Sequence, residues 1–257
     1  MPAVTIDLWH TLIYLPPEDE EAYMTHQLAM GQEVLRASRS LPGAPKVSDA
    51  DLGRAFERAY EGAVAESVEG RTVTPAEQVL RAGKETGRDP DPRAYLSKLR
   101  TEVEGTRFRI APGALDLLRE LRGLGYRVGV ISNTIGEPGE FLRPILARMG
   151  FDAYVETYVF SDEHPWTKPS PEIFRFALDR LKESPENAVH VGDGWADLEG
   201  ARRAGFRGAV LFTGLRSYGD RYRKMFLTEV PGEPPAKYRT DRLSEVAGIV
   251  RNLLPLS

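Results

Sequence analysis

The sequence predicts an α/β fold, a doubly wound parallel sheet with a helical subdomain inserted near its beginning. Three observations predict this fold. A short apolar run opens the chain, a long stretch with helical spacing follows it, and helices then alternate with strands as far as residue 212. A length of 257 residues fits one main core with an insertion, but not several large domains.

The first strand is expected in the run Ala3–Leu8, which is brief and β-branched. It ends on the sequence Asp7-Leu8-Trp9. From Glu18 to about Thr106, apolar residues recur at helical spacing, so we expect a bundle of roughly four helices there. Breaks rich in Pro and Gly separate these helices at Leu41–Pro45, Gly70–Pro75 and Gly87–Pro92.

After Pro112-Gly113 the chain alternates between helices and strands. Helices are expected at Ala114–Gly123, Glu140–Met149, Pro171–Lys182 and Ala196–Ala204. Strands are expected at Tyr126–Ile131, Tyr154–Phe160, Ala188–Val191 and Gly208–Phe212. Because repeated βα units connect by right-handed crossovers, they predict a parallel sheet covered on both faces. The helical bundle is therefore an insertion between the first two strands. The segment after Thr213, with Arg216 and Arg221, predicts no clear element until a closing helix at Arg242–Leu254.

Composition excludes several classes of function. The formal net charge of −4, without a basic stripe or tail, argues against a nucleic-acid binder. The absence of cysteine excludes disulfides, thiolate metal sites and cysteine nucleophiles, and it fits a reducing cytoplasm. No export signal and no run of about 18 apolar residues is visible. We therefore expect a cytoplasmic protein without a membrane span; the sequence does not predict its oligomeric state.

Polar residues cluster where the predicted strands end. In an open parallel sheet, ligands bind beyond the carboxyl ends of the strands, at the point where the strand order reverses. A single carboxylate at such a place often only caps a turn. An Asp, a Ser, a Lys and an Asp pair at successive strand ends are better explained as one site. They lie in Asp7–Leu12, Ser132–Thr134, Thr167–Pro169 and Gly192–Asp197.

The same stretches carry a resemblance to a known family. The ordered set TIDLWHTL, ISNT, TKPSPEIF and VGDGWADLEGARRAG resembles the four motifs of the haloacid dehalogenase-like superfamily, over about residues 3 to 212. The helical insertion resembles the cap of that superfamily. The resemblance implies a Rossmann-like core domain made of residues 1–13 and 107–257, and a helical cap domain made of residues 14–106.

The resemblance also implies a magnesium-dependent hydrolase with Asp7 as covalent nucleophile, most simply a phosphatase for a small phosphorylated metabolite. Mg²⁺ takes about six oxygen ligands. Here they would include Asp7, the backbone carbonyl of Trp9, Asp193 and Asp197, the last directly or through a water molecule.

The remaining catalytic and substrate contacts implied by the resemblance come from the two middle motifs. Ser132 and the backbone amides near Asn133 would hold phosphate oxygens. Lys168 would offset the negative charge of the nucleophile and of the transferred group.

Trp9 departs from the pattern of the superfamily's phosphatases, most of which carry a second Asp two positions after the nucleophile. That Asp is the general acid and base for the leaving group, a role that typically contributes about 10² to 10⁴ in rate. Hydrolysis of esters with poor leaving groups should suffer accordingly. Dehalogenases of the superfamily usually have an aromatic residue at this position, so a metal-independent 2-haloacid dehalogenase with Asp7 as nucleophile is an open alternative.

Other positions bear on that alternative. Where dehalogenases usually have serine, asparagine and tyrosine, this chain has Asp193, Gly194 and Phe174, and the Asp193 carboxylate favours a metal site. Arg36 or Arg39 of the cap is the candidate for receiving a halide or carboxylate, although cap arginines are more often solvated. A catalytically silent binding member is a third alternative, but the retention of nucleophile, lysine and metal-site carboxylate together argues against it.

His10 occupies a position that is normally glycine in the superfamily. Its imidazole, poised near neutral pH, either replaces the missing proton donor or packs beside the cap hinge. Trp9, His10 and Asn133 are assigned to substrate binding. Further expectations place His190 in the core, His26 on the cap surface, Trp195 in packing near the cap, and His164 and Trp166 on a surface loop or at the substrate entrance.

Overall fold

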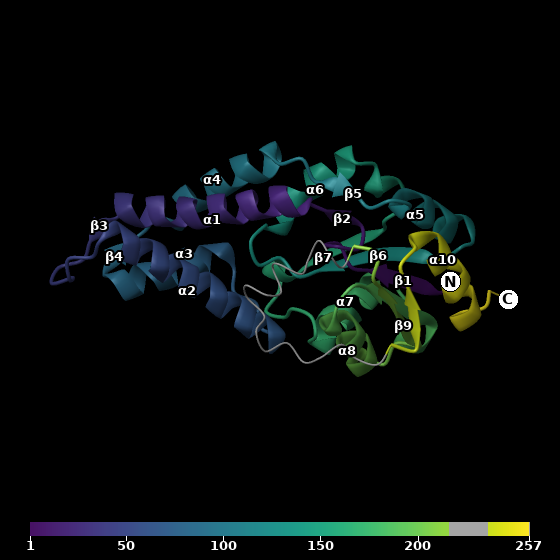
Figure 1. Cartoon of the computed structure of the whole chain (residues 1–257). Coiled ribbons are helices and arrows are strands. Elements are labelled where there is room, and N and C mark those ends of the chain that lie inside the picture. The colour runs from purple at the N-terminus through teal and green to yellow at the C-terminus, as the bar shows by residue number, and fades with distance from the viewer. Residues whose placement is uncertain (216–235, 257) are drawn as a thin grey trace.

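The computed structural model describes residues 1–215 and 236–256, and its core is a six-stranded parallel sheet (Figure 1). The order is β10-β9-β8-β1-β6-β7, so the chain winds outward from β1 in both directions. This confirms the predicted doubly wound sheet. The strands are β1 Ala3–Ile6, β6 Arg127–Ser132, β7 Thr157–Phe160, β8 Ala188–Gly192, β9 Gly208–Phe212 and β10 Tyr238–Thr240.

Helices cover both faces of the sheet, as predicted. On one face, α5 and α10 pack against each other and share an apolar core with α6; on the other face, α7 and α8 form a second core with residues such as Ile131 and Val159. These helices are α5 Ala114–Gly123, α6 Gly139–Arg148, α7 Pro171–Arg180, α8 Trp195–Ala204 and α10 Leu243–Leu253. The predicted closing helix is therefore present as α10. Arg216 and Arg221 lie outside the described residues.

Four helices form the insertion between β1 and β6, which confirms that prediction too. They are α1 Pro17–Ala37, α2 Asp49–Val68, α3 Pro75–Thr86 and α4 Pro92–Gly105. The sequence sets their ends: Ser48 and Thr74 close capping boxes at the starts of α2 and α3, and Asp91 caps α4. Gly87 ends α3 in the left-handed conformation that glycine adopts without strain.

Two small antiparallel pairs complete the insertion. β2 (Ile13–Tyr14) pairs with β5 (Arg109–Ile110) where the chain leaves and re-enters the core, and β3 (Arg39–Ser40) pairs with β4 (Arg88–Asp89) at the far tip (Figure 1). We propose that the β2–β5 pair marks the boundary between the core and a cap domain of residues 14–106.

The cap lies directly over the carboxyl ends of the strands. The backbone N–H of Thr167, in the loop after β7, donates to the carbonyl of Gly70 in the α2–α3 connection at 3.1 Å. Nearby, the Thr72 hydroxyl donates to the Ser161 carbonyl at 3.0 Å. These bonds hold the cap against the loops that carry the polar motifs. No helix within the described ranges is long and apolar enough to cross a membrane.

Candidate active site

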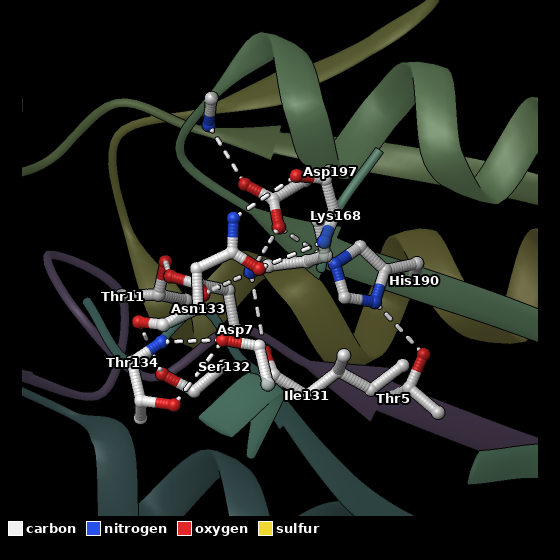
Figure 2. A network of polar contacts seen from close by, with 12 residues as sticks. Thr5, Asp7, Thr11, Ile131, Ser132, Asn133, Thr134, Lys168, His190 and Asp197 are labelled. Atoms are coloured by element: carbon white, nitrogen blue, oxygen red, sulfur yellow. Dashed lines mark hydrogen bonds and ion pairs between the residues drawn. The ribbon is translucent and has the colours of Figure 1, made fainter. Parts of the chain in front are cut away.

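Lys168 lies at the centre of a buried polar network at the strand ends (Figure 2). Its Nζ donates to Asp7 Oδ1, to Asp197 Oδ1 at 2.7 Å and to the carbonyl of Ile131 at 3.2 Å. The side chains of Lys168, Asp7 and Asp197 are only 4 to 6% exposed. A buried ammonium requires such compensation. The two carboxylates raise the pKa of Lys168 despite its burial, so this side chain is cationic at neutral pH.

Asp7 follows β1 directly and is fixed by the neighbouring strand. Its backbone N–H donates to the Val191 carbonyl of β8 at 2.8 Å, and the Thr11 hydroxyl donates to Asp7 Oδ2 at 3.2 Å. Burial raises the pKa of the Asp7 carboxyl to about 7; the Lys168 ammonium opposes that rise, whereas Asp197 and Asp193 add to it. One lysine therefore does not compensate this group of carboxylates, and a further cation would favour ionised Asp7.

Asp197 is held by three donors. Its Oδ1 accepts from Lys168 and from His190 Nε2 at 3.0 Å, and its Oδ2 accepts from the backbone N–H of Gly194 at 3.0 Å, at the start of α8. Although burial disfavours its charge, Lys168 and His190 hold the pKa of Asp197 well below its usual range. Asp197 is thus an ionised carboxylate that holds the Lys168 ammonium in place through their hydrogen bond.

His190 supports Asp197 from within β8. It is fully buried, and its Nδ1 lies 2.8 Å from the Thr5 hydroxyl of β1. Because ionised Asp197 can only accept, Nε2 carries the proton and Nδ1 accepts from Thr5. The expectation of a core histidine is confirmed, but the pairing with Asp197 was missed. The sole signal for it was a polar residue within the apolar run of β8.

Ser132 and Asn133 follow β6. Ser132 is fully buried at the strand end, and its hydroxyl makes one long contact, 3.4 Å, with the Asn133 carbonyl. The Asn133 side chain bonds the backbone of Lys168 twice, accepting from its N–H at 2.8 Å and donating to its carbonyl at 3.0 Å. The Asn133 side-chain amide is therefore bonded to the Lys168 backbone. Any contact of Asn133 with a substrate would have to come from its backbone.

Three carboxylates lie close enough together to share one cation. Asp7, Asp193 and Asp197 each offer an oxygen, and these oxygens all lie within 4.8 Å of one another. Carboxylate oxygens are the ligands that Mg²⁺ prefers. Asp193 is half-buried and so remains open to solvent. The donor set and the unbalanced negative charge both fit a hard divalent cation.

Trp9 and His10 form the junction between the Asp7 loop and the cap. The Trp9 ring packs edge-on against Phe108, with ring centroids 5.2 Å apart, beside the β2–β5 pair. His10 adopts a positive φ of 56°, which explains why a glycine would suit this position. Its Nε2 lies 3.2 Å from Glu20 Oε1 of α1. His10 thus contacts the cap through Glu20, and Trp9 packs against Phe108 beside the β2–β5 pair.

The arginines considered for a dehalogenase lie elsewhere. Arg36 pairs with Asp49 at 3.3 Å and Arg39 with Asp89 at 2.8 Å, and all four side chains are more than half exposed. Arg39 belongs to β3, at the tip of the cap far from the strand ends (Figure 1). The structure therefore contradicts a substrate contact for Arg39. The Arg36 side chain is likewise paired at the surface, with Asp49.

The remaining aromatic residues and histidines named from the sequence lie in the core, on the cap surface or in half-buried positions. Phe174 is fully buried, edge-on to His190 with centroids 5.0 Å apart. His26 is exposed on the cap surface, as predicted. His164 and Trp166 stack on each other in a half-buried loop beside the cap. The Trp166 backbone pairs with that of Arg71 in an isolated antiparallel β-bridge. Trp195 is half-buried and lies under the guanidinium of Arg203.

Fold and site together define the class of protein. A doubly wound α/β core with a helical insertion over its strand ends, and a buried lysine among carboxylates beneath it, is the architecture of a capped hydrolase. The chain belongs to the haloacid dehalogenase-like hydrolase family, whose model matches residues 1–205.

Named relatives match parts of the chain. The phosphoglycolate phosphatase of Nitrosococcus oceani is 27% identical over 156 residues, which cover 61% of this chain and 63% of the relative. The glyceraldehyde 3-phosphate phosphatase of Pyrococcus abyssi is 37% identical over 101 residues, or 39% of this chain and 41% of the relative. The chain therefore matches less than two thirds of the length of either relative.

A solved structure matches nearly the whole chain. The crystal structure of a HAD phosphatase from Thermococcus onnurineus covers 97% of this chain and 98% of its own, with a TM-score of 0.63 and 22% identity. At this identity the likeness shows a shared fold.

Proposed function

We propose that the protein is a Mg²⁺-dependent phosphatase of small phosphate esters, and that it works through an aspartyl phosphate on Asp7. The observation that carries this proposal is the buried Asp7 carboxylate, which contacts Lys168 and shares a cation-binding arrangement with Asp193 and Asp197. The partial matches to two named phosphatases support it.

The proposed reaction has two displacements at phosphorus. A carboxylate oxygen of Asp7 forms a bond to phosphorus while the ester P–O bond breaks, and the leaving oxygen takes the electron pair and then a proton from solvent. Water next attacks the phosphorus of the aspartyl phosphate and loses a proton to solvent, while the bond between phosphorus and the Asp7 oxygen breaks and leaves its electron pair on that oxygen. This second step releases inorganic phosphate and restores Asp7.

The residues of the site divide the work. Bound Mg²⁺ would offset the repulsion between Asp7 and the phosphoryl group. Asp7, Asp193 and the Trp9 carbonyl would hold it, with Asp197, already occupied by three donors, acting through water. The Ser132 hydroxyl and the backbone amides near Asn133 would bind phosphate oxygens, and Lys168 would stabilise the charge on the transferred group.

Trp9 should shape the choice of substrate. Because no carboxylic acid stands at this position, the leaving oxygen takes its proton from solvent. Aryl and acyl phosphates, whose leaving groups are stable as anions, should therefore react faster than alkyl esters. The cap over the strand ends would restrict, without abolishing, the access of water to the reacting atoms. We propose a cytoplasmic location, which suits a phosphorylated metabolite as substrate.

A second candidate, a metal-independent 2-haloacid dehalogenase, is favoured by the aromatic Trp9 alone. Asp193 in the carboxylate group and the surface pairing of Arg39 speak against it.

One experiment separates the two candidates. Purified protein is assayed with p-nitrophenyl phosphate and with 2-chloropropionate, in Mg²⁺ and in EDTA, with Asp7→Asn as the blank. We expect phosphate release that requires both Mg²⁺ and Asp7. Chloride release that survives EDTA would replace our proposal with the dehalogenase, and phosphate release by the blank would refute Asp7 as nucleophile.

A further inference from the structure

Buried polar side-chain atoms without a hydrogen-bond partner lie along the junction between cap and core. Throughout the described ranges, such side-chain atoms are Glu20 Oε2, Tyr23 OH, Gln78 Oε1 and Thr167 Oγ1. All four residues line the junction between cap and core: two belong to α1, one to α3, and Thr167 precedes Lys168 and bonds the cap through its backbone. Buried polar groups are nearly always satisfied, so these atoms mark positions where an ordered water or a polar ligand would complete the hydrogen bonds.

One face of α1 forms part of this junction and contacts loops of the core. Glu20, Tyr23 and Gln27 follow one another at intervals of three and four, which places them on the same side of the helix. Glu20 contacts His10 of the Asp7 loop at 3.2 Å, and Gln27 Nε2 donates to Glu137 Oε1, in the loop after β6, at 3.0 Å. These contacts place the face beside the two loops that carry Asp7 and Ser132.

Two of the four unpartnered atoms can only accept a hydrogen bond, and the two hydroxyl groups can accept or donate. Gln78 is fully buried, and its Nε2 donates to the Ile135 carbonyl at 2.7 Å, which fixes the amide orientation and leaves Oε1 as the free acceptor. Glu20 Oε2 is a carboxylate oxygen. The Tyr23 hydroxyl, on a side chain that is 6% exposed, lies beside Glu137 without a hydrogen bond of normal geometry.

The junction holds two carboxyl groups, Glu20 and Glu137, and Glu20 forms its ion pair with His10. Neither Glu20 nor Glu137 has a lysine or arginine among its hydrogen bonds and ion pairs in the part of the chain that the structure describes. Lys168 is already bound to Asp7 and Asp197. Burial raises the pKa of Glu137, which favours its neutral form as long as no cation lies beside it. A cation placed here would favour ionisation of Glu137, whereas an additional anion would disfavour it further.

We propose that the junction formed by Glu20, Tyr23, Gln78 and Glu137 binds a protonated amino group on the alcohol half of the phosphate ester. An ammonium group supplies three donors and a positive charge, which match the free acceptors and the two carboxylates. A carboxylate or a second phosphate would meet like charges and unpaired acceptors. This inference rests on the proposed phosphatase function and narrows it to amino-substituted substrates.

The test compares three esters of similar size but different charge: phosphoethanolamine, glycerol 3-phosphate and 2-phosphoglycolate. We expect kcat/KM to fall in that order, with phosphoethanolamine at least about tenfold above 2-phosphoglycolate. Glu20→Gln and Glu137→Gln should each reduce this ratio several-fold. The control is Glu33→Gln, an exposed residue of α1 that pairs with Lys98, and it should keep the wild-type ratio.

Equal or inverted preference in the wild type would overturn the inference, as would an unchanged ratio in both glutamine variants. The p-nitrophenyl phosphate assay reports on the proposed function separately. If that assay shows no turnover, calorimetric titration of Asp7→Asn protein in Mg²⁺ with phosphoethanolamine and 2-phosphoglycolate still decides the inference. Tighter binding of the amine supports it, and equal or weaker binding refutes it.

Discussion

Replacement of Lys168 by methionine tests the electrostatic balance of the site most sharply. The substitution preserves most of the buried volume but removes the ammonium that contacts Asp7, Asp197 and the Ile131 carbonyl. Removing one partner of a buried ion pair typically costs about 3 to 5 kcal/mol, because the other charge stays buried without compensation. We expect a loss of this size in the free energy of unfolding at pH 8 without Mg²⁺.

The loss should shrink under two conditions. At pH 5 more of Asp7 is protonated, so less charge is left unpaired, and added Mg²⁺ supplies part of the missing positive charge at pH 8. Urea denaturation measures the free energy of unfolding under all three conditions, which are pH 8 without Mg²⁺, pH 5, and pH 8 with Mg²⁺. The matched control is Lys98→Met, whose exposed pair with Glu33 should be worth less than about 1 kcal/mol. A Lys168→Met protein as stable at pH 8 as this control would refute the reasoning.

Three further predictions follow from single features. Since the folded pKa of Asp7 is raised from 3.8 to about 7, its contribution to stability is present below pH 3.8 and lost as the pH rises towards 7. Urea midpoints without Mg²⁺ should show this loss in wild type but not in Asp7→Asn, and identical pH profiles would contradict it. Trp9→Asp should raise turnover of glycerol 3-phosphate relative to p-nitrophenyl phosphate by about tenfold or more, because it restores a proton donor; an unchanged ratio would show that the leaving group needs none. Asn133→Ala removes both side-chain bonds to the Lys168 backbone and should cost about 1 to 3 kcal/mol of stability in urea titrations, whereas a negligible cost would mean that Lys168 is held by its ion pairs alone.

The sequence predicted the regular elements well because their signals are local. α2 and α3 begin at the N-cap residues Ser48 and Thr74, and breaks rich in Pro and Gly separate the helices of the insertion, all visible in the sequence. The paired strands of the cap were missed, since two residues such as Ile13–Tyr14 cannot show periodicity. β10 was missed because a three-residue edge strand gives equally little signal.

The candidate site was predicted in outline rather than in its connections. The rule that ligands bind at strand ends was enough to group Asp7, Lys168 and Asp193. The contacts that orient them depend on loop paths that only the fold determines, such as the Asn133 amide on the Lys168 backbone and His190 on Asp197. For the same reason, the contact between Glu137 and Gln27 of α1 has no signature in the sequence.

The central claim is that Asp7 carries the phosphoryl group during turnover. The most direct measurement is mass spectrometry of the peptide containing Asp7, from enzyme quenched in acid during hydrolysis of p-nitrophenyl phosphate with Mg²⁺. We predict the added mass of one phosphoryl group on Asp7, absent when EDTA replaces Mg²⁺. Steady turnover accompanied by a phosphoryl group on another residue, or continued turnover by Asp7→Asn protein, would contradict the account.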